Sequence, residues 1–265
     1  GELFFDNSSR HEAQKLIYST DASVYQEKPV AVAVPKTIED IKACIAFANN
    51  NHITLIPRAA GTSLAGQVVG KGMVVDISKY FKNVIELNVD ERWVRVQPGI
   101  IRDDLNAYLR PYGLMFAPET STANRAMVGG MIGNNSCGLH SIVWGDTRRH
   151  LLEAKVFLSD GSEAVFQNFS NLELKQKASG SGLEGKIYAQ LLSLLTDLSN
   201  QKIIEEKYPK KTLTRRNTGY ALDILLDEMQ QGGGFNLCHL LAGSEGTIAF
   251  VTEAKLNLIP LPPKQ

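Results

Sequence analysis

A run of twenty residues without a charged side chain, 126–145, most constrains what this chain can fold into. The run is long enough to suggest a membrane span, but it holds five glycines, two adjacent asparagines, two serines and a histidine. These polar groups would lack hydrogen-bond partners in lipid, so we do not expect a membrane helix. Each glycine would cost about 1 kcal/mol in a helix built only for packing. The run predicts backbone that approaches a ligand, although a glycine-rich apolar turn would have the same composition.

The charge and the metal-binding residue types exclude several classes of partner. Lys plus Arg total 28 and Asp plus Glu total 28, so the formal net charge is zero. Nucleic-acid-binding proteins normally carry a basic excess that neutralises phosphates, so we expect no nucleic-acid partner. The three cysteines show no C-x-x-C spacing and the five histidines are scattered. We therefore expect neither a disulfide framework nor a metal site.

The order of the expected elements indicates an α+β fold. Apolar runs at 29–35 and 53–57 predict strands on either side of a helix that begins after Thr37, where Asp40 completes a capping box. This strand–helix–strand order, followed by hairpins, favours α+β over a doubly wound parallel sheet. The stretch 200–217 is weakly determined. The further expected elements are strand 73–77, hairpin 84–96, helix 101–109, hairpin 151–166, helices 187–198 and 221–231, and strand 247–258.

Two glycine motifs resemble nucleotide-binding loops without meeting their requirements. A dinucleotide site needs a strand that runs into the first glycine of G-x-G-x-x-G, but the residues before Gly180–Gly185 are polar. We interpret that motif as a flexible loop before a helix and reject a nicotinamide dinucleotide site. The segment 61–67 lacks the lysine of a phosphate loop. It follows a strand and carries Thr62 and Ser63, so by itself it is compatible with an anion-binding nest or with an ordinary turn.

Three segments in their order along the chain are similar to one family. They are the loop 58–67, the glycine-rich segment 118–138 and the segment 243–248, which is weak evidence alone. Together they resemble the PCMH-type FAD-binding domain of the vanillyl-alcohol oxidase superfamily over residues 29–260. The string 129–138 resembles the branch of FAD-linked 2-hydroxy-acid dehydrogenases, which includes D-lactate dehydrogenase, the glycolate oxidase flavoprotein subunit and D-2-hydroxyglutarate dehydrogenase. It looks like the subset in which a long chain continues into an iron–sulfur region.

The resemblance implies a two-lobed domain, with lobes 1–80 and 81–265, that holds non-covalent FAD between them. The loop 58–67 would hold the pyrophosphate, slightly reshaped by two alanines where the family often has glycines. Covalent members carry a histidine in this loop and this chain has none there, so we interpret His140, the nearest candidate tether, as a polar wall residue. The residues assigned to FAD on this resemblance are Arg58, Ala59, Ala60, Gly61, Thr62, Ser63, Gly66, Gln67, Pro118, Glu119, Thr120, Thr122, Gly129, Gly130, Gly133, Asn134, Asn135, Ser136, Gly138, Gly145, Glu245, Gly246 and Ile248.

The resemblance also implies chemistry that this chain does not complete. In the family a C-terminal substrate domain covers the flavin and supplies the catalytic base, and it would begin near Pro262, where this chain stops. We therefore assign no catalytic residue. The segment 215–220 resembles a family segment near the active site and is equally compatible with a basic surface cluster.

We expect the parent enzyme to oxidise a 2-hydroxy acid by hydride transfer to flavin N5. Its electrons would pass to an iron–sulfur centre or a membrane quinone. The alternatives are an FAD-dependent oxidase of a sugar or alcohol, and a non-catalytic flavin-binding subunit of a complex. The N-terminus shows no basic and apolar leader pattern, which predicts a cytoplasmic location or membrane association through a partner.

Overall fold

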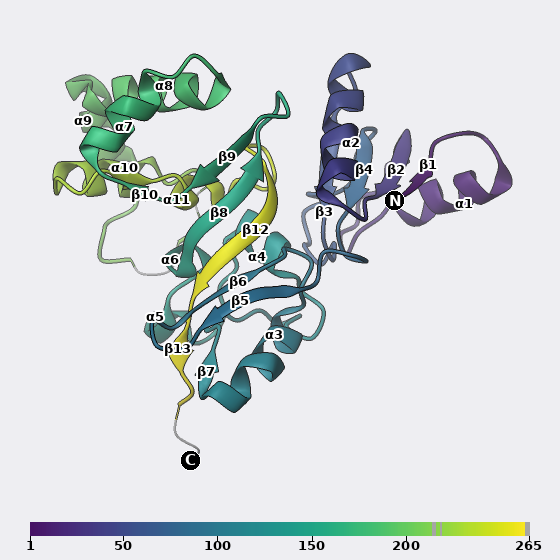
Figure 1. Cartoon of the computed structure of the whole chain (residues 1–265), viewed down its shortest axis with the longest axis horizontal. Helices are drawn as coiled ribbons and strands as arrows, with labels where there is room; N and C mark the ends of the chain where they lie inside the picture. Colours follow the sequence, from purple (N-terminus) through teal and green to yellow (C-terminus); the bar gives the residue numbers. More distant parts are fainter. Residues whose placement is uncertain (214–215, 218, 263–265) are drawn as a thin grey trace.

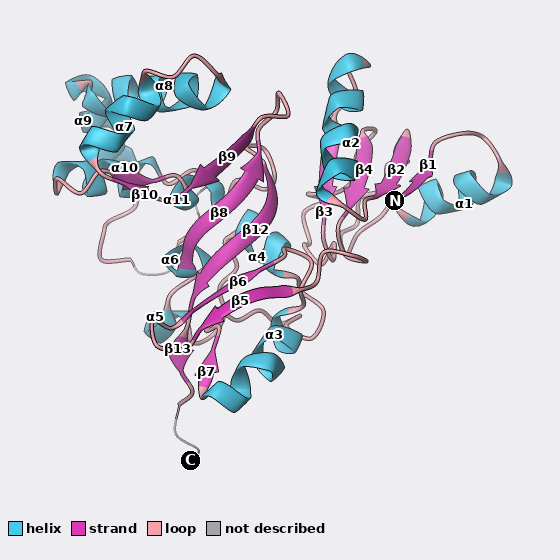
Figure 2. Ribbon diagram, viewed as in Figure 1, coloured by secondary structure: helices cyan, strands magenta, loops and turns pink. Residues whose placement is uncertain are grey.

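The computed structural model describes residues 1–213, 216–217 and 219–262. It contains two main sheets, one built from strands before residue 77 and the other from strands after residue 83 (Figure 1). Helices lie around both sheets rather than alternating regularly with parallel strands (Figure 2). The predicted α+β class is confirmed. The division of the chain into lobes near residue 80 stays a prediction.

The first sheet has four strands in the spatial order β1-β2-β4-β3. β2 and β3 both pair in parallel with β4, while β1 pairs antiparallel with β2. The capping box predicted for the crossover helix is confirmed, because the Thr37 side chain accepts a hydrogen bond from the Asp40 amide. The elements of this part are β1 (Glu2–Phe4), α1 (Ser9–Ile17), β2 (Ala31–Val34), α2 (Ile38–Asn50), β3 (Leu55–Arg58) and β4 (Met73–Asp76).

The second sheet has five strands in the order β5-β6-β12-β8-β9, and all its pairings are antiparallel. The last strand in the sequence, β12, lies at its centre. Residues along β12 alternate between buried and half-buried, which matches the two-residue period of a strand. The two predicted hairpins are confirmed. The strands are β5 (Val84–Asn88), β6 (Trp93–Val96), β8 (Leu151–Phe157), β9 (Glu163–Phe166) and β12 (Phe250–Asn257).

Shorter elements complete the second part. The helices that follow β9 gather beyond one end of the five-stranded sheet (Figure 1). The uncharged run 126–145 folds into two short helices, and no helix of the described residues is long and apolar enough to cross a membrane. These elements are α3 (Arg102–Leu109), η1 (Arg110–Tyr112), β7 (Leu114–Met115), α4 (Val128–Asn134), α5 (Ser141–Trp144), α6 (Thr147–His150), β10 (Asn168–Phe169), α7 (Asn171–Ala178), α8 (Leu183–Thr196), α9 (Leu198–Lys207), α10 (Leu222–Gln230), β11 (Phe235–Asn236), α11 (Cys238–Leu241) and β13 (Ile259–Pro260).

Two helices were not expected from the sequence. The polar residues before Gly180 form α7, which begins with a capping box between Ser170 and Glu173. The weakly determined stretch after residue 200 begins inside α9, which has one fully buried side chain, Ile204. Because each helix buries a single residue, neither shows a clear apolar period. Packing against α8 stabilises both instead.

The G-x-G-x-x-G motif has a packing role in the turn between α7 and α8. A helix precedes the motif in place of the strand that a dinucleotide site requires, which agrees with the rejection of such a site. Residues 180–182 form the expected loop before a helix, whereas residues 183–185 already belong to α8, and the flexibility of the loop stays a prediction. A Cβ at Gly185 would lie only 2.1 Å from the carbonyl oxygen of Gly180.

We expect Gly185→Ala to lower the free energy of unfolding by about 1–3 kcal/mol, because the added methyl group collides with the Gly180 backbone in the turn between α7 and α8. Gly182→Ala is the matched control, since a Cβ at Gly182 meets no atom within 4 Å. Urea denaturation of both variants measures the difference. Equal stability of the two variants would show that the close approach of Gly185 to the Gly180 carbonyl oxygen contributes nothing to the free energy of unfolding.

Candidate functional site

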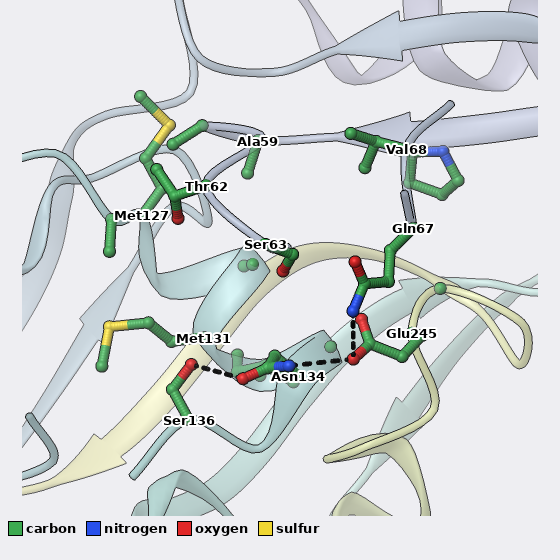
Figure 3. Close-up of a pocket in the computed structure, with 18 of the residues that line it drawn as sticks. Ala59, Thr62, Ser63, Gln67, Val68, Met127, Met131, Asn134, Ser136 and Glu245 are labelled. Carbon is green, nitrogen blue, oxygen red and sulfur yellow. Dashed lines mark hydrogen bonds between the residues drawn. The ribbon is translucent and has the colours of Figure 1, made fainter. Parts of the chain in front are cut away.

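A cavity of about 510 Å³ opens between the two sheets. Three segments far apart in the sequence line most of it, namely the loop after β3, helix α4 and the loop that enters β12 (Figure 3). Its volume lies within the range of small-molecule and cofactor sites. The cavity thus brings together the three segments that the sequence analysis singled out.

Most residues assigned to FAD from the sequence line this cavity. Seven do not, and they are described separately below. The assigned residues that line it are Arg58, Ala59, Ala60, Gly61, Thr62, Ser63, Gln67, Thr120, Thr122, Gly129, Gly130, Gly133, Asn134, Ser136, Glu245 and Gly246.

The loop after β3 presents a row of unused backbone donors to the cavity. Within the described residues, the amide N–H groups of residues 60–64 donate no hydrogen bond to the protein. Residues 60–63 are half-buried and Leu64 is exposed, so these amides are accessible to water or to a ligand that accepts hydrogen bonds. Successive free amides in a turn form a concavity suited to an anion. Thr62 and Ser63 add two hydroxyl groups to the same wall.

Arg58 adds positive charge behind this loop without entering the cavity as a free cation. Its guanidinium donates to the backbone oxygens of Tyr18 and Thr20, at 3.4 and 2.8 Å, and stacks on the Tyr18 ring. Its Nη2 lies 3.0 Å from where a Cβ of Gly61 would be, so the charge lies directly behind the Gly61 backbone. The guanidinium therefore supports an anion at the free amides through space.

The two alanines do not strain the loop. Positive φ is confined in this loop to Gly61 (63°) and Gly66 (76°), so Ala59 and Ala60 keep the backbone region that alanine favours. Gly61 and Gly66 supply the left-handed conformations instead. The reshaping that the alanines led us to expect therefore has no basis in the φ angles of the described loop.

Helix α4 forms the floor of the cavity, and its glycines serve two purposes. A Cβ at Gly129 would lie 2.8 Å from the Pro98 side chain and 3.1 Å from its carbonyl oxygen, so Gly129 permits close packing. A Cβ at Gly130 would meet only Ala59, at 3.6 Å, and would otherwise extend into the cavity. Gly130 thus leaves space that a ligand can fill.

The loop that enters β12 caps the end of α4. The amides of Gly243 and Glu245 donate to the carbonyl oxygens of Ile132 and Gly133, at 3.0 and 2.9 Å. The Glu245 carboxylate accepts hydrogen bonds from Asn134, at 3.0 Å, and from Gln67, at 3.5 Å (Figure 3). These contacts join all three cavity segments at one side chain.

The other assigned residues support the walls from outside. Asn135, the left-handed C-cap of α4, donates to Asp146 at 3.0 Å and accepts from the Arg148 amide at 2.8 Å. Gly138 packs tightly against Glu119, and Gly145 packs against Arg149. The assigned residues that do not line the cavity are Gly66, Pro118, Glu119, Asn135, Gly138, Gly145 and Ile248.

A buried arginine holds the outer side of the loop that enters β12. Arg148 is 2 % exposed, and its guanidinium donates to the carbonyl oxygens of His239 at 2.8 Å, Gly219 at 3.2 Å and Ala242 at 2.6 Å. Burial lowers the pKa of this guanidinium from its ordinary value. Arg148 thereby fixes the backbone from which the loop carrying Glu245 starts. Of the segment 215–220 that we singled out, residues 215 and 218 lie outside the described residues.

His140 lies outside the cavity lining and is engaged by a carboxylate. Its Nδ1 lies 2.9 and 2.8 Å from the two carboxylate oxygens of Glu119. The ring also stacks against Trp144, with centroids 5.0 Å apart. Among the described residues, no histidine lines the cavity and no cluster of metal-ligating side chains is found.

Sequence reasoning missed the apolar part of the cavity. Met127 and Met131 lie one helical turn apart and face it (Figure 3). Ile77, Phe250 and Val251 also belong to the lining. The i, i+4 spacing of the two methionines inside a glycine-rich run was an available signal. Nothing in the sequence brings Ile77 and Val251 to one cavity, because their placement depends on how the two sheets pack.

The sequence profile of the FAD binding domain family matches residues 29–166, which is more than half of the chain. The chain belongs to this family. The observed cavity fits the cofactor, because FAD combines a diphosphate, for which the free amides are suited, with flat rings and sugar hydroxyls. This FAD binding domain thus places free backbone amides, polar side chains and apolar side chains around one cavity.

Several curated relatives share the sequence of this FAD binding domain. It is 40 % identical over 253 residues to D-2-hydroxyglutarate dehydrogenase of Pseudomonas putida, covering 94 % of this chain and 24 % of the relative. Identity to the enzyme of the same name from Escherichia coli is 39 %, over 98 % of this chain and 25 % of the relative. Glycolate oxidase subunit GlcD of Bacillus subtilis is 26 % identical, over 97 % of this chain and 42 % of the relative. The chain thus spans about a quarter of the curated dehydrogenases it matches.

Solved structures share the fold of the FAD binding domain at low sequence identity. Alkyldihydroxyacetonephosphate synthase superposes with a TM-score of 0.64 at 16 % identity, over 99 % of this chain and 38 % of that structure. The oxidase of 6-hydroxy-D-nicotine from Arthrobacter nicotinovorans superposes with a TM-score of 0.62 at 13 % identity, over 98 % of this chain and 42 % of that structure. At these identities the likeness concerns the fold alone.

Proposed function

We propose that this chain is the FAD-holding part of an oxidoreductase that oxidises a 2-hydroxy acid of the D-2-hydroxyglutarate type. The observation that carries the proposal is 38–40 % identity, over nearly the whole chain, to four proteins named D-2-hydroxyglutarate dehydrogenase. The free amides of residues 60–64 give that similarity a physical basis, since they suit a diphosphate. Bound FAD would supply the hydride acceptor for a CH–OH donor.

In this proposal the chain binds and orients the cofactor. The loop 60–64 holds the diphosphate, Gly130 leaves room for it, and the apolar wall around Met131 excludes water from the rings. Non-covalent attachment is supported by the described cavity lining, which contains no histidine. The group that accepts the substrate's hydroxyl proton is not assigned to this chain.

The electron acceptor and the location are parts of the same proposal. An iron–sulfur centre or a membrane quinone would receive the electrons, in the cytoplasm or at a membrane reached through a partner. The likeness of string 129–138 to flavoproteins that continue into iron–sulfur regions supports the first acceptor. Oxidation of a sugar or alcohol is the alternative, and the comparison of substrates below distinguishes the two.

The test is anaerobic mixing of the FAD-loaded gene product that contains this chain with candidate substrates. We expect D-2-hydroxyglutarate to bleach the flavin absorption band, and its L-enantiomer to do so at least about a hundredfold more slowly, because a stereospecific site holds only one α-hydrogen near the cofactor. D-lactate, glycolate and a simple sugar are the comparison substrates. Bleaching by the sugar alone would overturn the proposed substrate class.

A further inference from the structure

We propose that Glu245 is a sugar-hydroxyl acceptor, so that its Oε2 atom accepts a hydrogen bond from a polyol hydroxyl of the bound flavin nucleotide. The inference rests on the proposed binding of FAD and adds which chemical group of the ligand this side chain recognises. FAD offers two polyols, the ribose of its adenosine half and the ribityl chain of its flavin half. Both present the same chemistry to a carboxylate.

The hydrogen bonds around Glu245 leave one carboxylate oxygen unused. Asn134 and Gln67 both donate to Oε1, at 3.0 and 3.5 Å. Asn134 is itself oriented, because its Oδ1 accepts from the Ser136 hydroxyl at 3.1 Å (Figure 3). Within the described residues, Oε2 accepts no hydrogen bond and no cation pairs with the carboxylate. An exposed oxygen with fixed neighbours and free lone pairs is suited to accept from a ligand.

The backbone holds this carboxylate in a conformation that glutamate rarely adopts. Glu245 has φ of 50°, in the left-handed region, between Gly243 and Gly246, which also have positive φ. Its amide is bonded to the Gly133 carbonyl oxygen at 2.9 Å. Strained non-glycine residues of this kind gather at ligand sites, where the surrounding structure enforces them. Oε2 consequently lies over α4, 4.0 Å from where a Cβ of Gly133 would be.

The charge of Glu245 is unsuited to a contact with the diphosphate. Among the described residues that line the cavity, only Arg58 and Glu245 are charged, and Arg58 donates to backbone oxygens behind the loop. An unmatched carboxylate would repel a diphosphate and weaken its binding. A hydroxyl that donates to the carboxylate gives the negative charge a favourable contact.

The position of Glu245 favours a polyol over a ring. Gln67, Asn134 and Glu245 lie together on one side of the cavity, whereas Met127 and Met131 lie on the other (Figure 3). Flat aromatic rings pack well against thioether and aliphatic groups. The polar side is therefore left for the hydroxyl-bearing part of the nucleotide.

The test compares ligand pairs that differ in their hydroxyl groups. Competition against FAD fluorescence measures the affinities of ADP and 2′,3′-dideoxy-ADP, and of riboflavin and lumiflavin, which carries a methyl group in place of the ribityl chain. The unaltered chain, Glu245→Gln and the control Glu206→Gln are titrated. Glu206 lies exposed on α9, so the control removes one charge away from the cavity. Glutamine at position 245 keeps an oxygen that can accept from Asn134.

We expect Glu245→Gln to weaken FAD binding about tenfold, because a charge-assisted hydrogen bond is replaced by a neutral one. The loss should appear for ADP but not for dideoxy-ADP if the ribose is held, or for riboflavin but not lumiflavin if the ribityl chain is held. Either pattern supports the proposal.

Three outcomes would overturn it. Equal losses within both pairs would assign the contact to a ring N–H group. Tighter binding of FAD by Glu245→Gln would mean that the carboxylate only repels the diphosphate. Unchanged binding of FAD would mean that the Glu245 carboxylate makes no contact with the nucleotide. In all three cases the unaltered chain still binds FAD, whereas failure of that chain to bind FAD would overturn the proposed function as well.

Discussion

Replacing Gly130 by leucine is expected to abolish retention of FAD while leaving the fold intact. A side chain at this position meets only Ala59 at ordinary contact distance and extends into space that the cofactor would occupy. We expect affinity for FAD to fall by about a hundredfold or more, which corresponds to about 3 kcal/mol. The free energy of unfolding without FAD should stay equal or rise by up to about 1 kcal/mol, because glycine is a poor helix former. FAD affinity is thus expected to fall without a fall in the free energy of unfolding.

The measurement is an absorption spectrum after addition of FAD and passage through a desalting column, together with urea denaturation. Gly182→Leu is the matched control, because that position faces open space and has negative φ. A Gly61 substitution is less informative, since its φ of 63° strains any other residue. Retention of the flavin band by Gly130→Leu at the level of the control would contradict the assignment of the cavity.

Replacing Arg148 by methionine is expected to give the largest loss of stability. The change removes the donor to the carbonyl oxygens of His239, Gly219 and Ala242, of which the Ala242 oxygen belongs to a fully buried residue. Each unsatisfied buried acceptor costs about 1–3 kcal/mol, and methionine keeps much of the apolar stem. We expect the free energy of unfolding to fall by about 3–5 kcal/mol.

Urea denaturation compares this variant with Arg125→Met, which alters an exposed arginine whose guanidinium donates a hydrogen bond to the neighbouring Asn124 side chain. The control should change stability by no more than about 0.5 kcal/mol. FAD affinity of Arg148→Met should also fall at temperatures where the chain remains folded, because Ala242 begins the loop that carries Glu245. A stability equal to that of the control would refute the role of Arg148 as the anchor of this loop.

Local signals in the sequence predicted a large part of the fold. Helix α2 follows from the Thr37–Asp40 capping box and its apolar period, and the hairpins β5–β6 and β8–β9 follow from apolar runs separated by turn residues. Helix α7 also carries a capping box, but that signal was outweighed by its polar composition. Helix α9 buries only Ile204, so its stability depends on packing against neighbouring elements, which its own residue pattern does not reveal.

What the sequence by itself determined is which backbone segments line the cavity, because glycine and small polar residues at 58–67, 129–138 and 243–248 are costly without a use of this kind. Only the tertiary structure decided which atoms face the cavity. Gly129 and Gly130 are adjacent and identical in type, but only Gly130 leaves free space, because Pro98 packs against the other. The convergence of Gln67 and Asn134 on Glu245 spans up to 178 positions of the chain. Such long-range contacts depend on how two sheets pack, and no local residue pattern encodes them.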